Sequence, residues 1–211
     1  SHISAQPNAT AQHKEKNTVI NFNASNHGAG GGGPSTADAL ESTTYQATLI
    51  AAQMYKNNKY QSEELTNQIT LIWDTGLVME TDEGEEVPVY IYDTFINFSF
   101  NEKAKLTSRL KALGFEISPT TNVQLKINGA SNLDELEHTK LGRDARKAVE
   151  AWEINGENVF GREALVTVEV VERNDRKYAN VTNASPPMRS PAGGKVKARP
   201  ATNEAPAGAP V

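Results

Sequence analysis

Aromatic and cationic side chains alternate over a short polar stretch around two adjacent asparagines. Tyr55 and Lys56 precede the asparagines, and Lys59 and Tyr60 follow them. Flat rings can stack on the bases of an unpaired nucleic-acid strand, and ammonium groups attract its phosphates. The same pattern also fits a hairpin whose lysines are solvated and whose tyrosines pack on a neighbouring strand. Both interpretations stay open, and the first makes these four residues candidate nucleic-acid contacts.

A second aromatic pair lies in a segment with strict alternation. Tyr90 and Tyr92 are separated by one residue and alternate with Val89 and Ile91. Side chains two positions apart on a strand point to the same face of the sheet. We expect Val89 and Ile91 in the core and the tyrosines on the outer face. There they form either a stacking platform or a cross-strand aromatic pair that supports the sheet.

The other candidates divide by residue type. Large aromatic side chains elsewhere are more typical of a core: Trp73, Phe95, Phe98, Phe115 and Trp152. Trp73 is nevertheless kept as a further candidate for base stacking. Candidate phosphate contacts on a predicted helix and in a predicted hairpin turn are Lys103, Lys105, Arg109, Arg173, Arg176 and Lys177. Charged residues in a turn also serve solubility alone, which is the alternative for the last three.

Enzymatic and metal-binding motifs are missing from the sequence. There is no cysteine, and of the four histidines only His138 lies outside the first 43 residues. The glycine run at 28–33 lacks the lysine of a phosphate-binding loop and is typical of a flexible linker. No nucleophile elbow is present. We therefore expect no enzyme activity, no cofactor and no metal site.

Composition predicts one domain between two flexible segments. Residues 1–43 are Gly-rich and residues 185–211 are Pro/Ala-rich, and both lack apolar periodicity, so we expect disorder there. Residues 44–184 hold the apolar periodicity, with 15 Lys and Arg against 22 Asp and Glu. This acidic balance argues against duplex binding over the whole surface but leaves room for one basic groove. The apolar runs are too short to span a bilayer, and we expect a cytoplasmic protein.

Strand patterns dominate the predicted domain. We expect strands at 45–52, 66–73, 87–93, 123–128 and 159–172, with a last strand from residue 178 after a turn at 174–177. A helix is predicted after the third strand. Ser99 and Glu102 have capping-box spacing, a leucine face follows, and Gly114 ends the helix. Two further helical pieces are expected around 131–141 and 145–152.

The fold class is mainly β with helices. Five to six strands with a helix after the third fit a small OB-fold-like β-barrel. An open antiparallel sheet flanked by helices gives nearly the same pattern.

Three segments carry a family resemblance: Tyr45–Leu49, the stretch 98–114 with its Lys103–Leu106 and Leu110–Gly114 motifs, and Phe160–Glu169. Their order resembles small OB-fold proteins encoded among bacteriophage replication and recombination genes. The resemblance covers residues 44–184, although the insert at 117–157 is longer than that pattern implies. It implies single-stranded DNA binding in the host cytoplasm, with replication proteins or a second copy as further partners. The alternative is a phage structural or assembly protein.

Overall fold

The computed structural model describes residues 36–59 and 61–187. All of them belong to the second of two compact units into which the chain divides, Pro34–Val211. The strands are β1 (Thr44–Asn58), β2 (Leu65–Glu80), β3 (Glu86–Asn97), β4 (Val123–Ile127), β5 (Lys147–Ile154), β6 (Glu157–Asn158), β7 (Glu163–Arg173) and β8 (Arg176–Ser185). The helical elements are α1 (Lys105–Ala112) and the 3-10 turns η2 (Thr36–Ala39), η3 (Leu133–Glu135), η4 (Thr139–Leu141) and η5 (Arg143–Ala145). The fold is therefore mainly β, as the sequence predicts.

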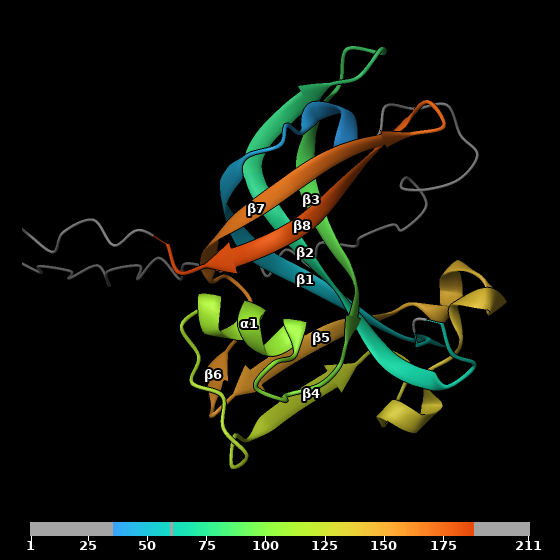
Figure 1. Cartoon of the computed structure of the whole chain (residues 1–211), viewed down its shortest axis with the longest axis vertical. Helices are drawn as coiled ribbons and strands as arrows, with labels where there is room; N and C mark the ends of the chain where they lie inside the picture. The colour runs from blue at the N-terminus through green and yellow to red at the C-terminus, as the bar shows by residue number, and fades with distance from the viewer. Residues whose placement is uncertain (1–35, 60, 188–211) are drawn as a thin grey trace, which may run out of the picture. The chain divides into compact units, whose positions relative to one another are not determined.

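The long strand β1 organises the sheet. It pairs along its length with β2, which pairs with β3 in an antiparallel meander. On its other side the first half of β1 pairs with β7, and β8 follows as a hairpin partner of β7. The second half of β1 pairs with β5, which joins β4 and β6 in a smaller sheet. Figure 1 shows this smaller sheet at the same end of the domain as α1.

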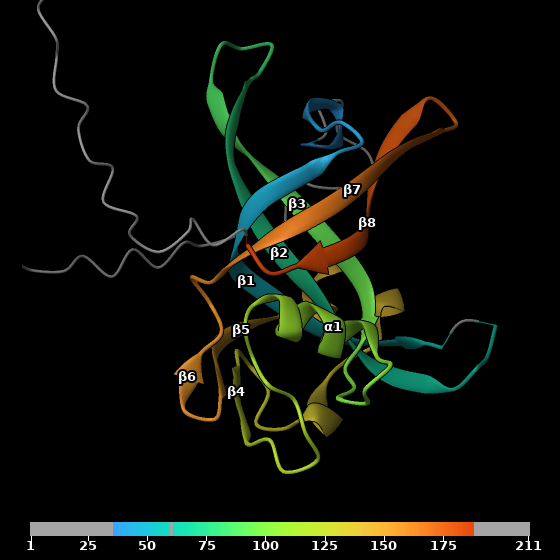
Figure 2. The same cartoon turned by 60° about the vertical axis from the view of Figure 1, so that its left-hand side comes forward.

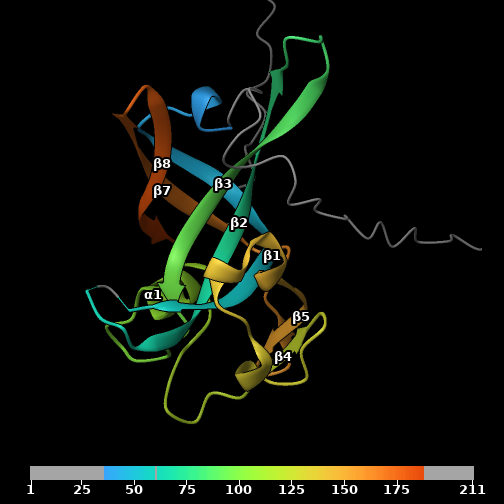
Figure 3. The same ribbon diagram turned by 90° about the vertical axis from the view of Figure 1, so that its right-hand side faces the viewer.

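The expected closed barrel is not formed. Among the described residues, β3 and β8 lie close together but share no hydrogen-bonded ladder, so the sheet is open between them. Helix α1 lies near both strands at one end of this seam (Figure 2). At the opposite end, the tips of the β2–β3 and β7–β8 hairpins project from the domain (Figures 1 and 3).

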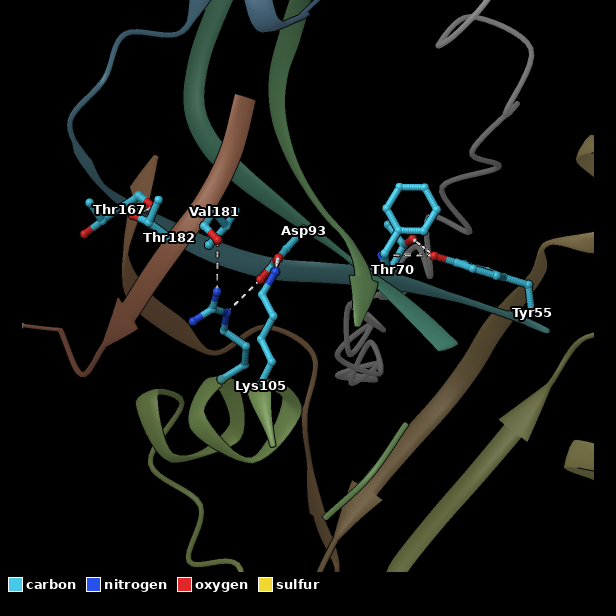
Figure 4. Close-up of polar contacts among 9 residues, drawn as sticks. Tyr55, Thr70, Asp93, Lys105, Thr167, Val181 and Thr182 are labelled. Carbon is cyan, nitrogen blue, oxygen red and sulfur yellow. Dashed lines mark hydrogen bonds and ion pairs between the residues drawn. The ribbon is translucent and has the colours of Figure 1, made fainter. Parts of the chain in front are cut away.

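A buried ion pair on α1 crosses this seam. Arg109 Nε donates to Asp93 Oδ2 of β3 at 2.7 Å, and Arg109 Nη2 donates to the Val181 carbonyl of β8 at 3.3 Å (Figure 4). The Arg109 and Asp93 side chains are 3% and 1% exposed. The Arg109 guanidinium on α1 thus links β3 and β8, which do not pair with each other. Lys105, one turn earlier and 42% exposed, adds an ion pair to Asp93 Oδ1 at 2.6 Å.

The core confirms the alternation read from the sequence. Val89 and Ile91 of β3 are fully buried, as are Leu106 and Leu110 of α1. The helix begins later than predicted. Its N-cap is Ala104, which makes no side-chain cap hydrogen bond, so the predicted capping box at Ser99 and Glu102 is wrong. Gly114 does take the predicted left-handed conformation after the helix, with φ of 89°.

The second predicted helical piece, around 145–152, is instead the strand β5. Val149 and Trp152 are three residues apart and both buried, a spacing typical of one helix face. In the structure the ladder with β4 shifts between Lys126 and Ile127, so Glu150 is an extra residue on β5. This β-bulge restores the two side chains to one face of the sheet.

The domain limits differ from those predicted at the N-terminal side. Residues 36–43, which were assigned to the flexible segment, include η2, and Leu40 joins the hydrophobic core at 4% exposure. β1 starts at Thr44 and β8 ends at Ser185. The predicted glycine-rich linker and most of the Pro/Ala-rich tail lie outside the described residues. The long predicted insert contains β4, β5 and the 3-10 turns η3 to η5.

We expect Asp93→Ala to lower the free energy of unfolding by about 3–5 kcal/mol, because it leaves the Arg109 charge buried without its partner. Lys105→Gln, which removes only the half-exposed cation, should cost less than about 1 kcal/mol. Urea denaturation of both variants measures the difference. Equal losses would show that the Asp93–Arg109 pair does not stabilise the seam.

Candidate nucleic-acid interface

The outer face of β3 carries a row of aromatic side chains. Tyr90 and Tyr92 alternate with the buried Val89 and Ile91, and both tyrosines are partly exposed. The sequence prediction of their face is thereby confirmed. On the neighbouring strand, Tyr90 pairs with Asp74 and Tyr92 with Ile72.

These two tyrosines are neutral at physiological pH. Burial is the main cause that raises the pKa of the Tyr92 phenol to about 12, and the negative charge of an ionised Tyr90 adds to it. Burial and the Asp74 carboxylate raise the pKa of Tyr90 above its ordinary value. A neutral phenol ring close to a phosphate chain avoids the like-charge repulsion that a phenolate would add.

Phe95 continues the row, although the sequence predicts a core position for it. Leu71 of β2 pairs with Asp93 and Ile69 pairs with Ile96, so Thr94 and Phe95 together oppose a single β2 residue in a β-bulge. Phe95 has φ of 56°, in the left-handed region, and its side chain is 59% exposed. The expectation of a core position for Phe95 is wrong, because the extra residue moves it off the inner face.

Tyr55 is buried rather than presented to solvent. Its exposure is 0%, and the Arg146 guanidinium stacks over its ring at 5.1 Å. The prediction that Tyr55 offers its ring to a base is therefore corrected. The sequence placed it near a loop tip, but β1 continues to Asn58 and keeps Tyr55 inside the sheet.

The Tyr55 hydroxyl supports the bulge. It accepts a hydrogen bond from the Phe95 backbone N–H at 3.1 Å and shares another with Thr70 Oγ1, also at 3.1 Å (Figure 4). Thr70 is fully buried as well. A buried side-chain network thus holds the backbone that turns the Phe95 ring outward.

A pocket of about 410 Å³ opens beside Phe95, where β3 leads into α1. Phe95 and Ala104 are the apolar part of its lining, and the polar part is Asn97, Ser99, Asn101, Lys103 and Lys105. Lys103 is exposed and has no ion-pair partner among residues 36–59 and 61–187. The pocket therefore combines an aromatic face, two amides and a free ammonium group.

The predicted cations of α1 have different fates. Arg109 is buried in its ion pair with Asp93, which removes it from the candidate contacts. Lys105 is partly exposed at the pocket, but its charge is shared with the same carboxylate. Both ion pairs have one cause, because Asp93 occupies an inward position of β3 where the sequence indicated only core residues. Lys103, two residues before the helix, forms no ion pair with Asp93.

Both lysines of the β1–β2 hairpin contact other groups of the domain. Lys56 Nζ donates to the Asp134 carbonyl at 2.7 Å, which ties β1 to the insert. Lys59 lies 3.6 Å from a Glu64 carboxylate oxygen. Tyr60 lies outside the described residues. The predicted aromatic–cationic surface at this hairpin therefore lacks the Tyr55 ring, and nucleic-acid contact by Lys56 and Lys59 stays a prediction.

The β7–β8 hairpin tip holds exposed cations. Asn174 and Asp175 form a two-residue turn with φ of 52° and 57°, which is shorter than the predicted turn at 174–177 because β8 already begins at Arg176. Arg173, Arg176 and Lys177 flank this turn and are exposed, and none of them forms an ion pair within the described part of the chain.

Trp73 lies in the core at 0% exposure, the position that its residue type favours. It cannot stack on a base in this structure.

No group of three metal-ligating side chains occurs among the described residues. Their helices are also too short and too polar for any to cross a bilayer.

Comparison with known proteins adds no relative. A scan against protein-family models and searches of curated proteins and solved structures find no match to this chain.

Sequence reasoning missed Phe95 and the amides of the pocket. The only local signal for Phe95 is the run of Asp93, Thr94 and Phe95, in which a polar residue already occupies an inward position. A buried aspartate next to an aromatic residue could have indicated an irregular strand there.

We expect the free energy of unfolding to fall as the pH rises between about 10 and 12, and Tyr92→Phe to fall less steeply. The folded state keeps the Tyr92 proton up to a pKa of about 12, whereas the phenol of the unfolded chain ionises near its ordinary pKa of 10.0. Stability is thus fully present below pH 10 and lost above it. Urea denaturation across this window tests the sign. Identical pH dependence in both proteins would contradict the burial of this phenol.

Proposed function

We propose that this chain binds single-stranded DNA along the outer face of β3, as an OB-like domain with an inserted sheet. The single observation that carries the proposal is the row of Tyr90, Tyr92 and Phe95 along one face of β3, next to the unpaired Lys103. Base stacking on such rings contributes roughly 1–3 kcal/mol for each base, with little sequence preference.

The strand order supports the OB assignment. An OB-fold is a five-stranded, partly open Greek-key barrel, which binds oligonucleotides on its second and third strands and at the loops beside them. Without the insert, the spatial order of the strands is β3-β2-β1-β7-β8. Along the chain, α1 follows β3 and precedes β7. The unpaired neighbours β3 and β8 correspond to the open seam. On this assignment, the β4–β5–β6 sheet accounts for the long insert after α1 that the sequence shows at 117–157.

The distribution of charge supports a single strand over a duplex. The chain has a formal net charge of -5, so its surface as a whole repels a polyanion. Two groups of candidate cations are exposed and form no ion pair in the described part of the chain: Lys103 just before α1, and Arg173, Arg176 and Lys177 at the β7–β8 tip. Figure 1 shows α1 and this hairpin tip in opposite halves of the domain. Between them the outer face of β3 offers neutral rings. A flexible single strand can follow such a track and unstack its bases onto it.

We expect labelled oligo-dT to bind at micromolar protein or below in low salt, and the affinity to fall steeply as salt is added. Replacing Arg173, Arg176 and Lys177 together with Gln should reduce the slope of log K against log salt by about 2, since each single-strand phosphate contact contributes about 0.7. Fluorescence anisotropy over a salt series measures both quantities.

Lys111→Gln is the matched control for charge removal. Lys111 is exposed in the last turn of α1, away from the pocket lining, and its loss should leave the slope unchanged. Absence of oligo-dT binding at low salt would refute the proposal. Stable oligomers without nucleic acid, seen by light scattering together with that absence, would favour an assembly role instead.

A further inference from the structure

We propose that the pocket between β3 and α1 holds one unstacked nucleotide, with its base on the Phe95 ring and its phosphate at Lys103, and that Tyr55 positions this site. The inference rests on the proposed function and adds to it a discrete nucleotide pocket at the helical end of the track. Nothing in the alternation of the sequence indicated it.

The first argument is the conformation of Phe95. A non-glycine residue in the left-handed region costs of order 1–3 kcal/mol and persists only where its surroundings impose it. Here the strain does not bury the ring, because Phe95 is 59% exposed. The fold therefore holds an apolar ring in solvent at an energetic cost, which points to a ligand that covers it.

The second argument is the support behind the bulge. Tyr55 and Thr70 are fully buried, and the Tyr55 hydroxyl accepts the Phe95 N–H at 3.1 Å. Its own proton can go to Thr70 Oγ1, also at 3.1 Å. This arrangement satisfies the backbone donor that the bulge frees from the ladder. Tyr55 touches no ligand in this proposal and is a positioning residue.

The third argument is the chemistry of the lining. A volume of about 410 Å³ falls within the range of about 300–1,000 Å³ typical of small-ligand pockets. The amides of Asn97 and Asn101 offer both donors and acceptors, which can match the edge of a base. The Asn97 Oδ1 is already held by Gln68 Nε2 at 3.0 Å, so this amide is oriented by the sheet.

A nucleotide is the ligand class that uses all of these groups. An aromatic face takes a flat base, the amides take its polar edge, and the Lys103 ammonium takes a phosphate. A nucleotide within a strand and a free mononucleotide share this chemistry. Oligo-dT and thymidine 5′-monophosphate distinguish the two sources.

The experiment combines Phe95→Leu, Tyr55→Phe and the double variant, with Tyr178→Leu as a control. Tyr178 is also an exposed aromatic residue, at 45%, but it lies on β8 outside the pocket lining. Oligo-dT affinity is measured by anisotropy. Binding of thymidine 5′-monophosphate is followed by backbone amide NMR shifts, and folding by urea denaturation.

We expect Phe95→Leu to weaken oligo-dT binding by about 5- to 150-fold, the equivalent of one lost stacking contact. Tyr55→Phe should weaken it severalfold in the wild-type background and not further in the Phe95→Leu background. A purely structural role of the hydroxyl would instead give additive losses. The mononucleotide should shift the amides of Phe95, Asn97 and Asn101, and Tyr178→Leu should preserve those shifts.

The outcomes separate the two proposals. Wild-type oligo-dT affinity in Phe95→Leu would overturn the pocket and leave strand binding intact. If wild-type protein binds no oligo-dT, the proposed function fails, and the mononucleotide then decides the pocket alone. Shifts confined to the pocket would support a site for free nucleotides, and their absence would overturn it.

Discussion

The buried contact of Arg109 with Asp93 is the interaction on which the arrangement of this domain depends. The sheet is open between β3 and β8, and backbone hydrogen bonds therefore do not hold these strands together. A guanidinium from α1 reaches the carboxylate on one strand and the Val181 carbonyl on the other. A buried charge is tolerated only when it is paired, so the helix, β3 and β8 are fixed to each other by that requirement.

This constraint also shapes the candidate interface. Asp93 takes the inward position of β3 directly before the bulge, and the two residues after it, Thr94 and Phe95, share one partner position on β2. The strand that binds Arg109 on its inner side is thus the strand that turns Phe95 outward. Because α1 is anchored at Asp93, the lysines at its start lie beside that ring and form the pocket with it. The residue of β3 that binds Arg109 and the residue that forms the candidate interface are thus only two positions apart, Asp93 and Phe95.

The regular parts of the fold could be predicted from sequence, and the misassignments of Phe95 and of β5 trace to single inserted residues. Strict alternation located β3 up to Ile91, and leucine spacing located the buried face of α1. A bulge shifts the side-chain parity by one, so every residue beyond it exchanges faces. Period two places Phe95 with Val89 and Ile91, and a three-residue spacing makes Val149 and Trp152 resemble a helix face. Neither bulge has a glycine or proline to mark it, and partner strands are not visible in a single sequence.

The candidate cations could be named from the sequence. Which of them are paired could not be predicted, because it depends on the carboxylate that each one meets in space. Arg109 and Lys105 meet Asp93 from across the seam, and Lys59 meets Glu64 within its own hairpin. In the described part of the chain, the cations before α1 and at the β7–β8 tip meet no carboxylate, and Lys56 meets only the Asp134 carbonyl. On the proposed function, the exposed cations attract phosphates and the rings on β3 stack on bases. A ligand that matches this surface must carry charge along its length yet expose flat apolar faces between the charges, and an unpaired strand does so whereas a duplex hides its base faces in the stack.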